Sequence, residues 1–250
     1  MRTIAIINQK GGVGKTTTTA NLAHALVLNE YKVTVIDLDP QGHLTTSLGI
    51  NYLERPGLDS VLMDDYPIES CVKEVRPGLC LIPSGPELGN IEHKAMHGAK
   101  RGTLLRDAMK GCFQDQDYVL IDCPPASNLL VINALFSTNE TLIPVASDYL
   151  SLQGLSYLIG TFKNFERLGH KINEWFVMTR FNTRRRLPQQ VMETLKQYFP
   201  QRVLATRVRE AAALAECPSF GKTIFEYKRN SNGAADYESL AIDLAHGRTI

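Results

Sequence analysis

The sequence predicts an α/β protein with a mostly parallel β-sheet and helices on both of its faces. Short apolar runs alternate with amphipathic segments along the chain, and a glycine-rich loop separates the first run from the first amphipathic segment. Parallel strands need crossover connections, which helices supply, so this alternation favours a sheet covered on both sides. A length of 250 residues with 44% hydrophobic content suits a single domain, which we expect to span residues 1–250.

The individual elements follow from the periodicity of their apolar residues. The run at 3–7 predicts a strand, and the segment 16–29 behind the glycine loop has apolar residues at helical spacing. Further strands are expected at 33–36, 79–82, 118–121, 141–145 and 175–178, and further helices at 101–112, 129–137, 151–168, 187–199 and 234–245. Residues 51–75 are richer in Pro, Asp and Glu, so we expect a surface excursion with little chemistry there.

Composition and charge narrow the classes of function. A net charge of +1 argues against a globally basic nucleic-acid coat, so any affinity for DNA must come from a local patch. Five cysteines without a C-x-x-C pair indicate a reducing compartment, and we expect a cytoplasmic protein. The chain begins directly with the first predicted strand, and no apolar run approaches the roughly 20 residues that span a bilayer, so we expect neither export nor membrane crossing.

The glycine-rich loop is the strongest chemical signal in the chain. It reads KGGVGKTT over residues 10–17 and lies between a strand and a helix, where backbone N–H groups and the helix N-terminus can bind phosphate. Lys15 would neutralise the β- and γ-phosphates of a nucleotide, and the Thr16 hydroxyl would bind Mg²⁺. The predicted nucleotide-binding residues of this loop are Lys10, Gly11, Gly12, Val13, Gly14, Lys15, Thr16 and Thr17.

The loop departs from the general phosphate-loop pattern in an informative way. That pattern has glycine at position 9, where this chain has Gln9, and the additional Lys10 matches the deviant motif K-G-G-x-G-K-[ST]. With VIDLDPQG at 35–42, DCPP at 122–125 and PSFGKTI at 218–224, the whole chain resembles the ParA/MinD family of ATPases. Within that family it is most similar to the small chromosomal, Soj-like ParA proteins and related cargo-positioning ATPases, which lack an extra N-terminal DNA-binding domain.

Asp37 and Asp122 each follow a run of buried-strand residues, so both carboxylates should emerge beside the phosphate loop at one edge of the sheet. The resemblance implies that Asp122 holds Mg²⁺ through its water shell and that Asp39 positions the attacking water. Asp37 would be a more distant partner of the metal or simply a cap at the end of its strand. The resemblance further implies that Lys10 reaches the partner's phosphates in an ATP-dependent homodimer, which makes Lys10, Lys15 and Asp39 the predicted catalytic residues.

The densest basic run contains Arg180, Arg184, Arg185 and Arg186, between a predicted strand and a predicted helix. Such arginines suit contacts with the phosphate backbone of DNA of any sequence, and Arg184 matches by position a family arginine implicated in nonspecific DNA binding. The alternative is a solvated helix start or pairing with acidic neighbours. A second family arginine corresponds here to Ala213; either part of the patch is lost, or Arg207 and Arg209 replace it.

Position 209 also bears on the adenine pocket. The family usually has proline there, against the adenine ring, whereas this chain has Arg209. We expect that Arg209 stacks on the base instead.

A MinD-like protein that cycles on membranes and a metabolic or redox relative are the alternatives to a DNA-bound positioning ATPase. The first would end in a basic amphipathic helix, whereas the segment 234–245 has an apolar face with Asp236, Glu238 and Asp243 elsewhere, which indicates a helix docked on its own core. Cys123 invites comparison with iron–sulfur ATPases, but it has no matching second cysteine.

Two further patterns are expected to carry no site. Gly221-Lys222-Thr223 repeats the end of the phosphate loop without a strand before it, and His93 and His97 have helical spacing without a third metal ligand. The resemblance thus implies an ATPase with ATP and Mg²⁺ that binds nonspecific DNA, associates with the nucleoid and works with a ParB-like or adaptor partner.

Overall fold

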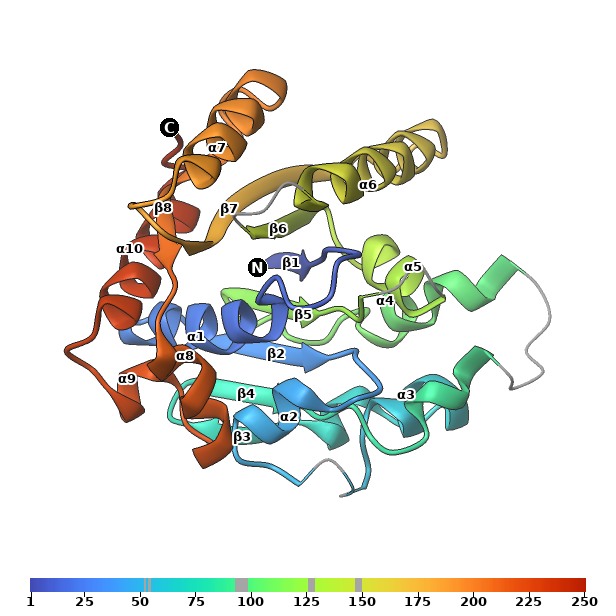
Figure 1. Cartoon of the computed structure of the whole chain (residues 1–250). Helices are drawn as coiled ribbons and strands as arrows, with labels where there is room; N and C mark the ends of the chain where they lie inside the picture. The colour runs from blue at the N-terminus through green and yellow to red at the C-terminus, as the bar shows by residue number, and fades with distance from the viewer. Residues whose placement is uncertain (52, 54, 93–98, 126–128, 147–149) are drawn as a thin grey trace.

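An eight-stranded sheet forms the centre of the molecule in the computed structural model, which describes residues 1–250 except 52, 54, 93–98, 126–128 and 147–149 (Figure 1). The strand order is β3-β4-β2-β5-β1-β6-β7-β8, and every pair is parallel except β3 with β4. The strands are β1 (Arg2–Ile6), β2 (Val33–Asp37), β3 (Lys73–Arg76), β4 (Leu79–Ile82), β5 (Tyr118–Asp122), β6 (Glu140–Ala146), β7 (Asn173–Phe181) and β8 (Val203–Arg209).

Helices cover both faces of this sheet, as the alternating pattern predicts, so the predicted fold class is confirmed (Figure 1). One face packs against α3 (Leu58–Asp64), α4 (Leu104–Ala108), α5 (Leu129–Phe136), α6 (Leu150–Arg167) and α7 (Arg186–Tyr198). The other packs against α1 (Lys15–Leu28), α2 (His43–Ser47), α8 (Ala212–Glu216), α9 (Ile224–Tyr227) and α10 (Asn232–His246). Short 3₁₀ helices are η1 (Ile68–Cys71), η2 (Leu88–Glu92), η3 (Ala99–Thr103) and η4 (Cys217–Phe220).

The periodicity analysis missed the two edge strands. β3 reads KEVR and β8 reads VLATRVR, so charged side chains interrupt the apolar pattern that identifies central strands. Charges on edge strands are tolerated because such strands have a neighbour on one side only, and they discourage pairing with other chains. The predicted helix at 101–112 is also shorter, because the 3₁₀ helix η3 precedes a brief α4.

The expectation of a surface excursion over residues 51–75 is wrong. Within it α3 buries Leu58 and Leu62 completely or nearly so, and η1 buries Ile68. The segment therefore contributes to the core on the α3–α7 face of the sheet. Its polar composition obscured a helix of less than two turns, too short for a clear 3.6-residue period.

Helix α10 docks on the body of the protein, as its apolar face predicts. Tyr237, Leu240 and Leu244 are buried against the sheet and α1. Asp236 and Asp243, which were expected away from this face, are buried as well. Asp243 accepts hydrogen bonds from the backbone N–H and the hydroxyl of Thr206 at 2.7 and 2.6 Å, so it fixes α10 to the edge strand β8. Among the described residues, no helix is both long and apolar enough to cross a membrane.

Candidate functional site

The carboxyl ends of three central strands meet at one edge of the sheet. Ile6 at the end of β1 and Asp37 at the end of β2 are both in register with Asp122 at the end of β5. The phosphate loop leaves β1 at this edge and runs into α1, whose first residue is Lys15. The strand ends therefore bring both predicted carboxylates beside the loop, as parallel pairing requires.

The loop is shaped by its glycines and anchored by neighbouring strands. Gly12 and Gly14 have φ angles of 74° and 88°, a left-handed conformation that residues with a Cβ rarely adopt. The Thr179 hydroxyl on β7 donates to the Val13 carbonyl at 2.8 Å, and the Lys15 ammonium lies 3.4 Å from the Lys10 carbonyl. The sequence analysis missed Thr179, because nothing in its own segment marks a polar residue of β7 as an anchor of the loop.

Asp122 is fully buried and bound by the start of α1. The Thr16 hydroxyl donates to one carboxylate oxygen at 2.7 Å, and the Thr19 hydroxyl donates to the other at 3.2 Å. Burial, together with the nearby carboxylate of Asp37, raises the pKa of Asp122 above its ordinary value. Burial also lowers the pKa of the Lys15 ammonium, although Asp122 and Asp39 oppose that shift.

Asp37 connects its strand to α2. Its carboxylate accepts from the Thr45 backbone N–H at 2.8 Å, the Thr45 hydroxyl at 2.6 Å and the Asp39 N–H at 3.2 Å. Burial raises the pKa of Asp37 in spite of these hydrogen bonds. Asp37 thus caps the start of the segment after β2 and also lies beside Asp122. A cap at the strand end and a more distant partner of the metal are therefore compatible roles for this residue. Asp39 is 7% exposed, and its carboxylate accepts a hydrogen bond from the Gln41 N–H at 3.0 Å.

These side chains fit a magnesium ion. Mg²⁺ prefers carboxylate, hydroxyl and water oxygens, and the Thr16 hydroxyl and the Asp122 carboxylate are 2.7 Å apart. Two fully buried carboxylates lie on neighbouring strands, and among the described residues Lys15 is the cation that acts on Asp122, so their negative charge is incompletely compensated. A divalent cation would supply the missing positive charge.

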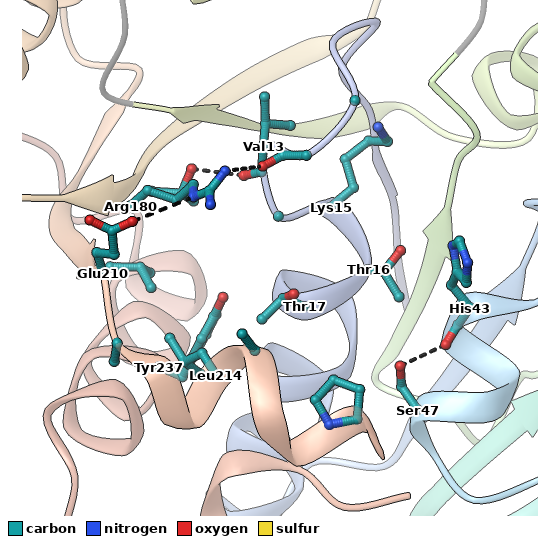
Figure 2. A pocket seen from close by; sticks show the side chains of 18 of the residues that line it. Val13, Lys15, Thr16, Thr17, His43, Ser47, Arg180, Glu210, Leu214 and Tyr237 are labelled. Atoms are coloured by element: carbon teal, nitrogen blue, oxygen red, sulfur yellow. Dashed lines mark hydrogen bonds and ion pairs between the residues drawn. The ribbon is translucent and has the colours of Figure 1, made fainter. Parts of the chain in front are cut away.

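The phosphate loop forms one wall of a pocket of about 1020 Å³ (Figure 2). The opposite wall comes from α8, η4 and α10, where Leu214, Pro218 and Tyr237 line the space. The Tyr237 hydroxyl is 3.2 Å from that of Thr18. The pocket is polar at the loop and apolar at the far wall, which suits a ligand with an anionic chain and a planar, less polar group. Its volume is at the upper end of the usual range for small-molecule sites.

Arg209 lines this pocket, but its guanidinium is engaged by α10. Nη2 donates to Asp236 Oδ1 at 2.6 Å, and the Arg209 backbone N–H donates to Oδ2 of the same residue at 2.9 Å. The guanidinium of Arg207 instead lies 5.3 Å from the centre of the Phe181 ring. Both arginines are held within the fold, which disfavours them as replacements for the family arginine that is absent at Ala213. An adenine contact by Arg209 stays a prediction.

The arginine run is divided by the structure. Arg184 and Arg185 on the connection from β7 to α7, and Arg186 at the start of α7, are exposed. The described part of the chain contains no ion pair that involves them. Arg180 lies apart from them, at the mouth of the pocket, where Nη1 donates to the Gly12 carbonyl at 3.1 Å (Figure 2). Within the described residues, pairing with an acidic neighbour, one of the alternatives for this run, applies to Arg180 alone, which lies 4.0 Å from Glu210.

The structure explains the patterns that were expected to carry no site, as far as their residues are described. Gly221 ends η4, and Thr223 caps α9 in a capping box with Glu226, so the second G-K-T is a connection between two short helices. Cys123 is buried and all five cysteines are free. His93 and His97 lie outside the described residues, and among those described no three His, Cys, Asp or Glu residues are grouped to hold a metal.

Comparison with known proteins identifies the family. A family profile described as an AAA domain matches residues 1–175. The chain is 38% identical to the chromosome partitioning protein ParA of Myxococcus xanthus, with 97% of this chain and 87% of that protein covered. It is 37% identical to the sporulation initiation inhibitor protein Soj of Bacillus subtilis, with 97% of each covered. The chain belongs to the ParA/MinD family of ATPases.

The ParA/MinD fold is also found in a biosynthetic enzyme. Cobyrinic acid a,c-diamide synthase from Mycobacterium smegmatis, solved with a bound ATP analogue and magnesium, superposes with a TM-score of 0.86 at 27% identity. The match covers 98% of this chain and 94% of that one. The fold alone therefore does not separate a partitioning protein from a biosynthetic enzyme. The higher identity to ParA and Soj over nearly the whole chain supports the Soj-like resemblance.

Proposed function

We propose that this protein is a cytoplasmic MgATP-hydrolysing dimerisation switch. In its ATP-bound, dimeric form it binds nonspecific DNA on the nucleoid, and with a ParB-like or adaptor partner it partitions or positions a cargo. The cargo can be a chromosome, a plasmid or a protein assembly. The relatives named as a chromosome partitioning protein and as Soj support the class.

The convergence of the phosphate loop and Asp122 carries this proposal. A bound nucleotide would place its phosphates against the loop N–H groups, with Lys15 beside them and the Thr16–Asp122 pair beneath. Magnesium, when bound, would neutralise phosphate charge, and its holders would be Thr16 and Asp122, with Asp37 behind them. The protein itself supplies position and charge, which phosphoryl transfer needs more than covalent help.

Asp39 and Lys10 would complete the reaction. Asp39 lines the pocket and is held by the Gln41 N–H, so its second carboxylate oxygen can orient an attacking water. Lys10 is half-buried on the loop, with its backbone N–H bound to Asn8 Oδ1 at 3.0 Å. From that position a lysine side chain could reach the phosphates of a facing copy. Hydrolysis would then depend on dimerisation, and a partner protein would stimulate it.

The exposed Arg184, Arg185 and Arg186 would bind the DNA backbone. Their charges are free of ion pairs within the described residues, which leaves them available for phosphates. Two such surfaces in a dimer would double the number of contacts, so DNA affinity would follow the nucleotide state. Helix α10 itself is packed on the core through Tyr237, Leu240 and Leu244, so it is not a basic amphipathic helix of the kind that a MinD-like membrane cycle uses.

Dimerisation tests the switch directly. We expect Asp39→Ala to bind ATP and to accumulate as a dimer by size-exclusion chromatography with light scattering, because the nucleotide would no longer be consumed. The same protein with ADP should remain a monomer, and Asp39→Ala combined with Lys10→Ala should remain a monomer with either nucleotide. Asp64→Ala, a change at the end of α3, serves as a control that should behave as wild type. A protein that hydrolyses ATP normally after Asp39→Ala would remove the role assigned to Asp39.

A further inference from the structure

Arg180 has an unusual position at the end of β7. Its backbone is left-handed, with a φ of 50°, which is uncommon for a residue with a side chain. The preceding Thr179 anchors the phosphate loop through the Val13 carbonyl. The Arg180 guanidinium binds the carbonyl one residue earlier in the loop, that of Gly12, at 3.1 Å. Two consecutive residues of β7 therefore hold two consecutive residues of the phosphate loop.

Glu210 lies beside Arg180, and both residues line the pocket (Figure 2). The Arg180 Nε atom is 4.0 Å from Glu210 Oε1, and the Glu210 backbone N–H donates to the Phe181 carbonyl at 3.2 Å. The two side chains are 60% and 54% exposed. This charge pair is thus loose and solvated, and such pairs contribute little to stability on their own.

We propose that Arg180 is a positioning residue of the nucleotide pocket, where it holds the phosphate loop and draws the polyphosphate chain inward, and that Glu210 opposes this attraction. This proposal rests on the proposed function, because it takes the pocket ligand to be a nucleotide. It also separates Arg180 from the DNA surface of Arg184, Arg185 and Arg186.

The chemistry of the guanidinium supports this assignment. A guanidinium carries five N–H donors in a planar fork, and one donor on the Gly12 carbonyl leaves others directed to anionic oxygens nearby. Arg180 and the phosphate loop line the same pocket, so a phosphate oxygen held by the loop lies within the field of this cation. Glu210 places a negative charge at the same mouth, which repels the same ligand.

Because the two charges have opposite signs, mutations of Arg180 and Glu210 distinguish an electrostatic role of the pair from a purely structural one. If the pair only held the end of β7 and the segment after β8 together, removal of either partner would weaken nucleotide binding. If the charges act on the polyphosphate, Arg180→Ala should weaken binding, whereas Glu210→Gln should strengthen it. Arg180→Lys keeps the charge but loses the fork, so it should restore part of the affinity.

The experiment is a titration of each full-length variant with MgATP by calorimetry at low and moderate salt. We expect affinity about tenfold lower for Arg180→Ala, as for loss of a hydrogen-bonded charge, and about twofold higher for Glu210→Gln. Arg106 and Asp107 form a matched control pair, 3.2 Å apart and 53% and 57% exposed, on α4. Arg106→Ala and Asp107→Asn should leave the affinity unchanged.

A second arm measures DNA co-sedimentation of Arg180→Ala at an ATP concentration that saturates it. Retention equal to that of the wild type is expected. Equal ATP affinity in Arg180→Ala and wild type would overturn the inference alone, as would a loss of affinity in both Arg180→Ala and Glu210→Gln. A wild-type protein that binds no MgATP would overturn the proposed function and this inference with it. Circular dichroism melting of each variant shows that the protein tested is folded.

Discussion

The carboxyl edge of the sheet and the connection from β7 to α7 differ in how their charges are held. At the sheet edge, Asp37 and Asp122 are fully buried, and hydroxyl and N–H donors fix their orientation. On the connection and at the first residue of α7, Arg184, Arg185 and Arg186 are exposed. The first region is preorganised for one small ligand, whereas the second can adapt to a long, variable polyanion.

This difference predicts two kinds of response to mutation. Buried groups act through precise geometry, so the loss of one should abolish a function or destabilise the fold. Exposed arginines act through summed charge, so single losses should be small and sensitive to salt. The following predictions test that contrast, from the largest expected effect to the smallest.

Lys15→Ala should reduce the affinity for MgATP by about a hundredfold or more, because it removes a nearly buried cation at the phosphate loop. Calorimetry or a fluorescent ATP analogue measures this loss. Lys222→Ala is the matched control, since Lys222 occupies the corresponding place in the second G-K-T and is exposed. Reduced ATP affinity in Lys222→Ala would show that the second G-K-T also binds nucleotide.

Asp39→Ala should lower ATP turnover by about a hundredfold while ATP affinity changes little. The carboxylate is proposed to act on the attacking water and not on the bound nucleotide, so the effect belongs to turnover. A phosphate-release assay at saturating ATP measures turnover, and an equilibrium binding measurement gives the affinity separately. Asp39→Asn keeps the shape of the side chain without its charge and should be nearly as slow.

Arg184→Glu combined with Arg186→Glu should abolish DNA retention at moderate salt while ATP-dependent dimerisation stays intact. The milder Arg184→Gln with Arg186→Gln should reduce the slope of log affinity against log salt by about two for each protomer. Filter binding over a series of salt concentrations measures this slope. As a control, Arg106→Glu with Arg167→Glu changes two other exposed arginines and should leave the slope unchanged. Unchanged DNA retention in the Arg184→Glu, Arg186→Glu protein would refute the assignment of this surface to DNA binding.

Asp243→Ala should destabilise the protein by about 2 kcal/mol, since it leaves the half-buried N–H and hydroxyl of Thr206 without their acceptor. For a chain of this size that corresponds to a fall in Tm of about 4–8 °C, measured by calorimetry. Glu238→Ala, an exposed change on the same helix, should shift the Tm by less than about 1 °C. Equal shifts would mean that the acidic residues of α10 have no structural role.

The sequence predicts the central strands and the phosphate loop well because both depend on local patterns. Continuous apolar runs mark β1, β2 and β5, and the spacing of Gly12, Gly14 and Lys15 reflects what a phosphate requires of the backbone. The convergence of Asp37 with Asp122 follows from parallel pairing, and the structure places them in register.

Contacts between distant segments could not be predicted in the same way. The bond from Thr179 to the phosphate loop and the salt bridge of Arg209 with Asp236 join residues far apart in sequence. No local pattern encodes such pairs, because each depends on how strands and helices pack. For the same reason the sequence alone places Arg180 in one run with Arg184–Arg186, although its guanidinium binds the Gly12 carbonyl of the phosphate loop.

Co-sedimentation of the Asp39→Ala protein with DNA and with anionic liposomes, in ATP and in ADP, tests the central claim most directly. The account predicts retention on DNA in ATP that disappears in ADP, falls steeply with salt and has no counterpart on liposomes. Pelleting with liposomes, or no retention on DNA in either nucleotide at low salt, would contradict a DNA-bound ATPase switch.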